Sequence, residues 1–162
     1  MAYSIGDMVV HPAYGGGRIK AIRERSFLDH TNQYYEIHMP AKNMTIMVPV
    51  GREDEVGLRP VSNSHIIEAM WAILGGAPDS LSDEYQERQD GIKDTIRGGD
   101  LIEIATALRD LAGRGETHKL TQADRGLLEQ AEAFLAGELA LAKGVALDEA
   151  KKRLRAALSS ES

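Results

Sequence analysis

The sequence contains no cysteine. Disulfide bonds, thiolate zinc sites and a cysteine nucleophile are therefore excluded, and the cytoplasm is the compartment that we expect. No run of apolar residues approaches the roughly 20 that a membrane-spanning helix requires. The N-terminus also lacks the basic and apolar segments that are typical of a secretion signal. We therefore expect a cytoplasmic protein that has no membrane partner.

Recognisable metal-binding and catalytic motifs are also absent. The histidines follow no metal-ligand spacing, so surface or capping roles explain them: His11, His30, His38, His65 and His118. The glycines at 15–17 are not followed by the Lys-Ser or Lys-Thr of a phosphate-binding loop, and a structural corner explains them better. No serine lies in a nucleophile-elbow motif. We predict that the protein is not an enzyme and has no metal, no cofactor and no small-molecule substrate.

One acidic cluster is the only feature that suits an enzyme. Paired carboxylates can serve as general acid and base, and four acidic residues lie close together in the sequence, namely Asp83, Glu84, Glu87 and Asp90. On an exposed helix, such a cluster is far more often a solvated face that interacts favourably with the helix N-terminus. Enzymatic use is therefore the weaker interpretation.

The charge of the chain is distributed unevenly. The net charge is -6, and residues 1–61 hold seven basic and seven acidic side chains. Residues 62–162 hold twelve basic and eighteen acidic side chains, so they carry the whole excess. A protein that coats nucleic acid relies on Lys and Arg to displace counterions from phosphates. We therefore expect no bulk binding of nucleic acid, whereas local contact by a few residues is compatible with this composition.

The first part of the chain carries the pattern of a small β-domain. Short apolar runs divided by turn residues predict strands near 8–10, 18–25, 33–39 and 44–49, with a closing segment at 56–59. A change of phase at Ile22 predicts a bulge in the second strand. Strands this short favour a closed or nearly closed barrel, because closure removes exposed strand edges.

Helical periodicity dominates the rest of the chain. Apolar residues recur at helical intervals in five segments, near 64–74, 82–97, 101–113, 122–143 and 147–158. Thr121 and Asp124 have the spacing of a capping box at the start of the longest helix. In the second helix we expect Tyr85, Ile92 and Ile96 to point inward. Isolated helices of this length are marginal in water, so we predict that they pack into one bundle.

Several motifs occur in an order that resembles one known family. They are Gly6-Asp7, residues 9–12 (Val-Val-His-Pro), Tyr14-Gly15, Gly17, residues 47–49 (Met-Val-Pro), 56–59 (Val-Gly-Leu-Arg), 104–105, 108–111 and 137–142. Together they resemble the CarD/CdnL family of bacterial transcription regulators, over nearly the whole chain. The resemblance implies a multi-module α+β protein. A Tudor-like, SH3-like small β-barrel would occupy residues 1–61, and an all-α bundle of about five helices would occupy 62–162.

The resemblance also implies a partner for the barrel. In family members this module binds the β subunit of RNA polymerase through an exposed edge, a mode in which backbone pairing between sheets gives affinity. The positions that would make this contact are Arg25, Ile37, Met47 and Pro49. The other interpretation is that Ile37 and Met47 belong to the barrel core. For Met47 the contact is favoured, because Ile46 and Val48 already supply the opposite face of the strand.

A contact with promoter DNA is implied as well, and here the sequence departs from the family. Members resemble one another in placing a tryptophan at the position of Leu81, followed by basic residues, and this indole wedges into the minor groove at the edge of the melted bubble. Here Asp83 and Glu84 follow an aliphatic residue and would repel phosphates. The residues left to contact DNA are Leu81, Arg88, Lys93 and Arg97. Trp71 does not replace the wedge, because we expect it in the interdomain core.

These inferences predict a transcription regulator. It would bind the RNA polymerase β subunit through its barrel, modulate promoter open-complex formation or stability with an altered and weakened DNA wedge, and associate with the nucleoid through the polymerase. Tethering would matter because it raises the local concentration of a weak DNA contact. The alternative is a protein adaptor whose acidic helical domain binds a protein partner and does not bind DNA.

Overall fold

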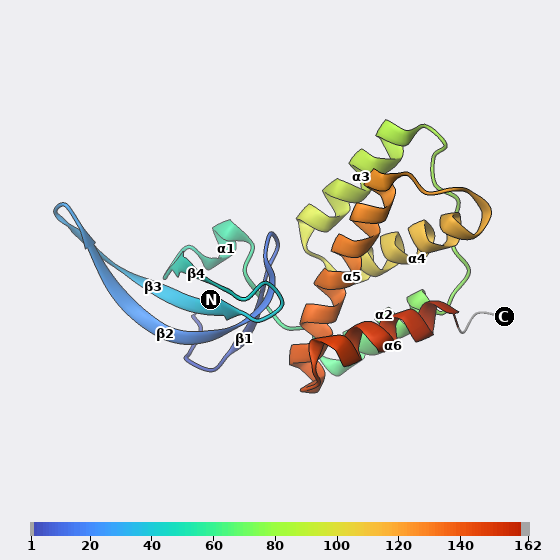
Figure 1. Ribbon diagram of the computed structural model, residues 1–162. Coiled ribbons are helices and arrows are strands. Elements are labelled where there is room, and N and C mark those ends of the chain that lie inside the picture. The colour runs from blue at the N-terminus through green and yellow to red at the C-terminus, as the bar shows by residue number, and fades with distance from the viewer. Residues whose placement is uncertain (1, 160–162) are drawn as a thin grey trace.

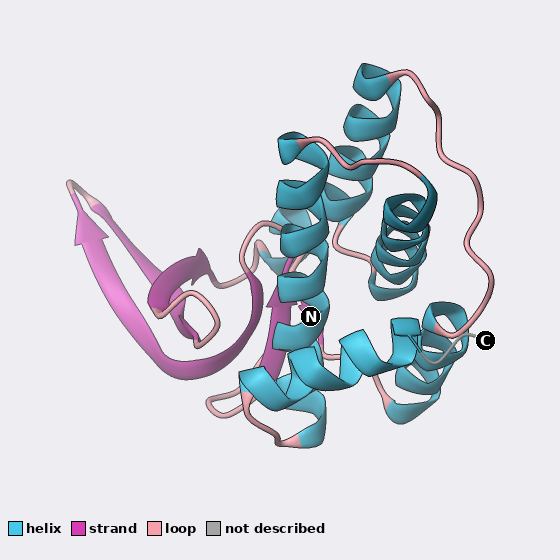
Figure 2. Ribbon diagram, turned by 45° about the vertical axis from the view of Figure 1, so that its right-hand side comes forward, coloured by secondary structure: helices cyan, strands magenta, loops and turns pink. Residues whose placement is uncertain are grey.

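The computed structural model describes residues 2–159, except for the side chain of Phe27. A five-stranded antiparallel sheet is followed by a group of helices, and the two parts lie side by side (Figure 1). The elements of the first part are β1 (Met8–His11), β2 (Gly15–Phe27), β3 (His30–Met39), β4 (Met44–Pro49), α1 (Glu53–Val56) and β5 (Arg59–Pro60). The predicted strands are present, and β2 and β3 form a long hairpin that reaches away from the helices (Figures 1 and 2).

The strands lie in the order β4-β3-β2-β1-β5, so β4 and β5 are the two edges of the sheet. The hydrogen-bonded ladder therefore does not close into a barrel. The sheet bends strongly instead, and Figure 2 shows β2 curving around the other strands. A register shift between Ile19 and Ala21 confirms the bulge in β2, slightly before its predicted position. The α+β prediction is confirmed, but the sheet is strongly bent and open rather than closed.

A buried carboxylate ties α1 to the core of the sheet. Glu53 is only 3 % exposed. Its Oε1 accepts a hydrogen bond from the backbone N–H of Gly51 (2.9 Å), and the Tyr35 hydroxyl donates to the same carboxylate. Burial acts to raise the pKa of Glu53, but these donors outweigh burial and hold the pKa below its ordinary value. Around Tyr35 lies the sheet core, which comprises Tyr3, Val9, Ile19, Tyr35, Ile37, Met39, Val48 and Leu58.

The second part consists of five helices, as predicted. They are α2 (Ser64–Leu74), α3 (Tyr85–Gly98), α4 (Leu101–Thr117), α5 (Gln122–Lys143) and α6 (Leu147–Ser159). The capping box at Thr121 and Asp124 is present at the start of α5. None of the described helices combines the length and apolar character needed to cross a bilayer.

Two helix ends differ from the prediction for local reasons. The α3 helix begins at Tyr85 rather than at Ser82, because the Glu84 side chain caps it by accepting from the backbone N–H of Glu87 (2.9 Å). The α4 helix continues past Gly113, where it was expected to end, up to Thr117. Gly113 serves close packing there, since an added Cβ would collide with the ring of Pro78.

The main helical core also receives one residue from the sheet. Buried residues of α2, α4, α5 and α6 form one cluster, and Val10 of β1 belongs to it. Trp71 is partly buried against the same cluster and is therefore not free to act as a wedge. The helices and the sheet therefore meet at an apolar surface through β1.

A buried ion pair joins α3 to the start of α5. Asp124 has no exposed surface, and its carboxylate accepts from Arg88 Nε (3.1 Å) and Nη2 (2.9 Å). Gln89 Nε2 (3.2 Å) and the backbone N–H of Thr121 (3.1 Å) donate to the same group. Burial alone would raise the pKa of Asp124, but these hydrogen bonds outweigh it and lower the pKa to about 2. Asp124 thus caps α5 and holds α3 against it.

Replacing Asp124 with Asn should therefore destabilise the protein. The variant leaves the Arg88 guanidinium buried without its anion, so the free energy of unfolding at pH 7 should fall by about 3–5 kcal/mol. The native-state pKa lies below the ordinary value of 3.8, so the carboxylate contributes fully above that value and loses its contribution as pH falls toward 2. Urea unfolding at several pH values should show the difference between wild type and variant shrinking over this interval.

The matched control is Glu149→Gln, which breaks an exposed ion pair with Arg153 (3.0 Å). Exposed pairs contribute little, so its effect should stay within about 0.5 kcal/mol. Equal losses for the two variants, or a loss in Asp124→Asn that is the same at pH 3 and pH 7, would contradict the role given to the buried pair.

Candidate functional site

Side chains alternate between the two faces of β3 and β4. In β3, Tyr35, Ile37 and Met39 are buried in the sheet core, whereas Tyr34 and Glu36 are partly exposed. The register pairs Tyr34 with Pro49 and Glu36 with Met47, so these four residues lie on the outward side. The same alternation places Arg23 and Arg25 of β2 beside them. We call this surface the outer sheet face, defined by Arg23, Arg25, Tyr34, Glu36, Met47 and Pro49.

Three of the four residues predicted to bind the polymerase lie on the outer sheet face. Arg25 is exposed, and Met47 and Pro49 are partly exposed. Ile37 does not join them, because its side chain is fully buried and the backbone of β3 is already paired on both sides. For Ile37 the structure thus favours the second interpretation, a place in the core. The Met47 side chain lies on one face of β4, and the side chains of Ile46 and Val48 lie on the other face.

The outer sheet face combines apolar surface with charge. Arg23 Nε lies 2.9 Å from Glu36 Oε1, an exposed ion pair that occupies both groups. Arg25 has no ion-pair partner within residues 2–159. Because β4 is an edge strand, its outer backbone groups border this surface. The arrangement offers a strand edge, a flexible Met side chain and one available cation in one place.

Of the residues predicted to contact DNA, Leu81 and Arg88 line a common pocket. Leu81 is partly buried and packs against a small core of Ile92, Leu111 and Leu127. Arg88 is buried in its ion pair with Asp124, so its guanidinium is not available to a phosphate.

Lys93 and Arg97 are exposed one turn apart on α3. Arg97 lies 3.1 Å from Asp94, in a pair that is open to solvent on both sides. Only Lys93 and Arg97 of the four remain on the surface with a free path to a phosphate backbone.

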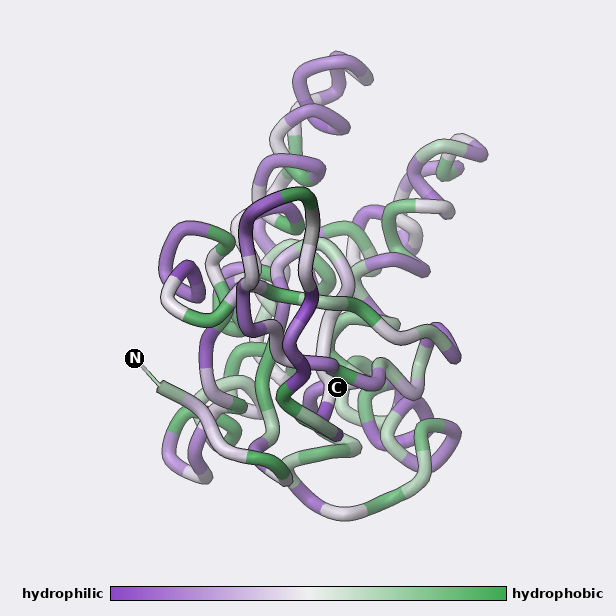
Figure 3. Tube along the Cα trace, turned by 90° about the vertical axis from the view of Figure 1, so that its left-hand side faces the viewer, coloured by the Kyte–Doolittle hydropathy of each residue, from purple (hydrophilic) through white to green (hydrophobic). Residues whose placement is uncertain are grey.

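Tyr85 is the exposed aromatic residue of this region. It is the first residue of α3 and is 61 % exposed, although helical periodicity predicted that it points inward with Ile92. The reason is visible in Figure 1, where the first turn of α3 extends beyond the neighbouring helices. The upper helical segments in Figure 3 are mostly hydrophilic. The one sequence signal for the exposure of Tyr85 is its position directly after the capping residue Glu84.

The acidic cluster around Tyr85 has structural roles. Glu84 caps α3, and Asp83 Oδ1 lies 3.2 Å from Arg114 Nη1 of α4. Within the described residues, no group of three or more His, Asp or Glu side chains is placed to hold a metal ion. The cluster thus matches the solvated face and helix N-terminus that the sequence favoured.

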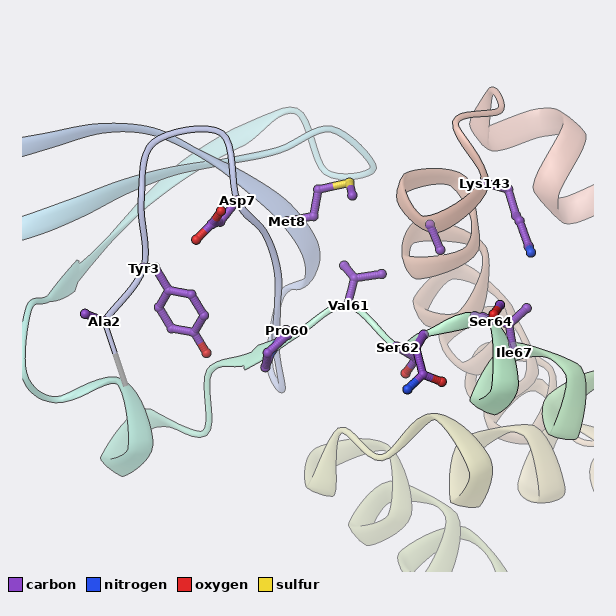
Figure 4. Close-up of a pocket in the computed structure, with 12 residues that line it drawn as sticks. Ala2, Tyr3, Asp7, Met8, Pro60, Val61, Ser62, Ser64, Ile67 and Lys143 are labelled. Carbon is purple, nitrogen blue, oxygen red and sulfur yellow. The ribbon is translucent and has the colours of Figure 1, made fainter.

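A cavity of about 500 Å³ lies between the sheet and the helices (Figure 4). Tyr3, Met8 and Val61 line it from one side, and Ile67 and Lys143 line it from the helices. It borders the linker to α2 and lies away from the outer sheet face and from Tyr85.

Two family models match the chain and together cover most of it. The CarD-like/TRCF RID domain matches residues 3–62, and the CarD C-terminal domain matches residues 69–155. The chain belongs to the CarD family. A CarD-type relative, YdeB of Bacillus subtilis (strain 168), is described as a candidate transcription factor. It is 32% identical over 143 residues, which are 88% of this chain and 94% of YdeB. Membership makes the chain a transcription regulator of a family that interacts with RNA polymerase.

Because Leu81 is packed and Tyr85 is exposed, we expect their replacement by Ala to have different effects on the free energy of unfolding. Leu81→Ala removes apolar contacts with a packed core and should lower the free energy of unfolding by about 1–3 kcal/mol. Tyr85→Ala removes a side chain that lies mostly in solvent and should change it by less than about 0.5 kcal/mol. Urea unfolding of the two variants beside wild type measures both values. A larger loss for Tyr85→Ala than for Leu81→Ala would show that the first turn of α3 is packed.

Proposed function

We propose that the chain docks on the β subunit of RNA polymerase through its outer sheet face and the edge of β4. The observation that carries this proposal is that Arg25, Met47 and Pro49 share one face beside an unpaired strand edge. A partner strand that adds to β4 would gain backbone hydrogen bonds, while side chains on alternate positions would give specificity. Association with the nucleoid follows from this docking.

We further propose that the helical part acts on the promoter open complex once it has been delivered there. Tyr85 is a better candidate for the wedge than Leu81, because an exposed aromatic ring can stack on or insert between bases. Lys93 and Arg97 lie further along the same helix and could approach phosphates. The nearby Asp83, Glu84 and Glu87 oppose phosphates, so the contact should be weak alone and depend on tethering.

A protein adaptor that does not touch DNA is the second candidate. The excess of acidic side chains in the helical part and the hydrophilic surface of α3 favour it. In that case a basic protein partner would bind α3. A pull-down that survives nuclease treatment, combined with no effect on open-complex lifetime, would favour the adaptor over the DNA-acting regulator.

A substitution of Met47 tests whether the chain docks through the edge of β4. Met47→Glu places a carboxylate on the outer sheet face beside Glu36, its cross-strand neighbour, so binding to the polymerase β subunit should weaken by about tenfold or more. The control is Ile5→Glu, an equally acidic change at a residue that is 63 % exposed and lies outside the outer sheet face. Titration of the full chain against a β-subunit fragment measures both. Equal affinity of the two variants would place the docking surface elsewhere.

A wedge at Tyr85 predicts an effect on the open complex without an effect on docking. Tyr85→Ala should shorten the open-complex lifetime that the protein supports, because base–aromatic contacts contribute about 1–3 kcal/mol each. Affinity for the β-subunit fragment should stay unchanged. Dissociation of open complexes after addition of a competitor measures the lifetime. Tyr85→Phe is the matched control and should retain most of the effect; a Tyr85→Ala protein that acts like wild type would exclude the wedge.

A further inference from the structure

A second buried ion pair joins the sheet to the helices. Glu138 of α5 has no exposed surface. Its carboxylate accepts from Arg59 Nη1 (2.8 Å) and Nη2 (2.7 Å) and from the backbone N–H of Ser62 (2.7 Å). Arg59 belongs to β5, and the two residues are 79 positions apart. Because a bidentate pair requires coplanar groups at short distance, it restricts the relative positions that β5 and α5 can take.

Arg59 also binds the turn that connects α3 to α4. Its Nε and Nη2 donate to the carbonyl oxygen of Gly99 (3.1 and 2.9 Å), which lies between α3 and α4. The same guanidinium therefore fixes α5 and the C-terminal end of α3 against the sheet. Tyr85 lies at the other end of α3, so the direction of this helix decides where Tyr85 stands.

The sheet and α5 also approach each other backbone to backbone. A Cβ added to Gly16 of β2 would lie 3.1 Å from the carbonyl oxygen of Gly137 and 2.8 Å from Leu141 Cδ1. The Gly137 carbonyl is part of the α5 backbone and cannot move aside as a flexible side chain can. A side chain at position 16 therefore requires α5 to shift by a few tenths of an ångström away from β2.

Packing does not fill the whole junction. The cavity of about 500 Å³ in Figure 4 lies on the side of the linker, lined by Met8 and Val61 from one part and Ile67 from the other. Apolar side chains therefore leave the angle between the two parts unsupported on that side. Beside the packing of Val10 in the helical core, the ion pair and the glycine contact fix this angle.

We propose that Glu138, acting through Arg59, is a positioning residue that fixes the angle between the sheet and the helices, so that docking of the outer sheet face places Tyr85 at a defined point. The effect on transcription then depends on this angle as well as on the contacts at either end. The use of the angle rests on the proposed function, whereas the rigidity of the junction does not.

Rigidity is tested first, in the full chain. The absence of cysteine allows spin labels at introduced cysteines, for example Lys20→Cys on β2 and Glu129→Cys on α5, both exposed. The label-to-label distance distribution should be narrow in the otherwise unchanged chain. It should broaden or shift in Glu138→Gln, which weakens the ion pair, and in Gly16→Ala, which keeps every polar group. The control is Gly126→Ala in α5, since nothing lies within 4 Å of its added Cβ.

Far-ultraviolet circular dichroism establishes that each variant is folded. If Glu138→Gln fails to fold, Gly16→Ala decides the question with its ion pair intact. A broad distribution in the parent chain, or an unchanged distribution in the folded variants, would overturn the proposal.

The positioning role is then measured on polymerase. Both junction variants should bind the β-subunit fragment within about twofold of wild type, because the outer sheet face is unchanged, while their effect on open-complex lifetime falls about tenfold. A purely structural role would not separate these two readouts. Normal lifetimes from a variant with a broadened distribution would overturn the positioning role. Failure of the wild-type chain to bind polymerase would instead refute the proposed function and the positioning role together, and would leave the measured rigidity standing.

Discussion

The Glu138 carboxylate is completely withdrawn from water and therefore requires strong donors, which Arg59 of the sheet and the linker N–H of Ser62 supply. This requirement organises the junction. Arg59 has to leave the sheet in the direction of α5, and the linker has to turn at Ser62 so that its N–H reaches the same carboxylate. In this arrangement the backbones of Gly16 and Gly137 also approach each other closely. The two parts therefore behave as one body whose angle is set by polar geometry.

Local signals were enough to predict the elements and the fold class. The alternation in residues 33–39, the helical spacing of apolar residues and the capping box at Thr121 and Asp124 all act over a few residues, so they are readable without a structure. The glycines at 15–17 show the limit. Only Gly15 has positive φ (85°), whereas Gly16 lies in β2 and is needed because α5 passes over it. A sequence cannot separate these two uses of glycine when the partner backbone lies 121 residues away in the chain.

In the candidate site, too, local relations were predictable from the sequence, whereas contacts with distant residues were not. Strand alternation predicted correctly that Met47 faces away from Ile46 and Val48, because that relation is local to β4. Exposure was not predictable where it depends on which neighbour covers a residue. Leu81 looked like a surface residue and is packed, while Tyr85 has the helical phase of a core residue and is exposed because α3 outruns its neighbours. The positive charge of Arg88 suggested a contact with phosphate, but in the structure its guanidinium is paired with Asp124.

The strand β1 explains why the sheet and helices should not be treated as separate units. Val9 and Val10 are adjacent, so their side chains point to opposite faces of the strand. Val9 is buried in the sheet core and Val10 in the helical core, so β1 contributes a side chain to each of the two cores. Unfolding either part would therefore expose apolar surface on the other. The same contacts couple the positions of the two parts. In the proposed docking, a force on the outer sheet face would pass through β1 and β5 into α5, because Arg59 of β5 is paired directly with Glu138 of α5. In the proposed function, a weak contact at the far end of α3 would thus act at a fixed place, where tethering gives the greatest gain in effective concentration.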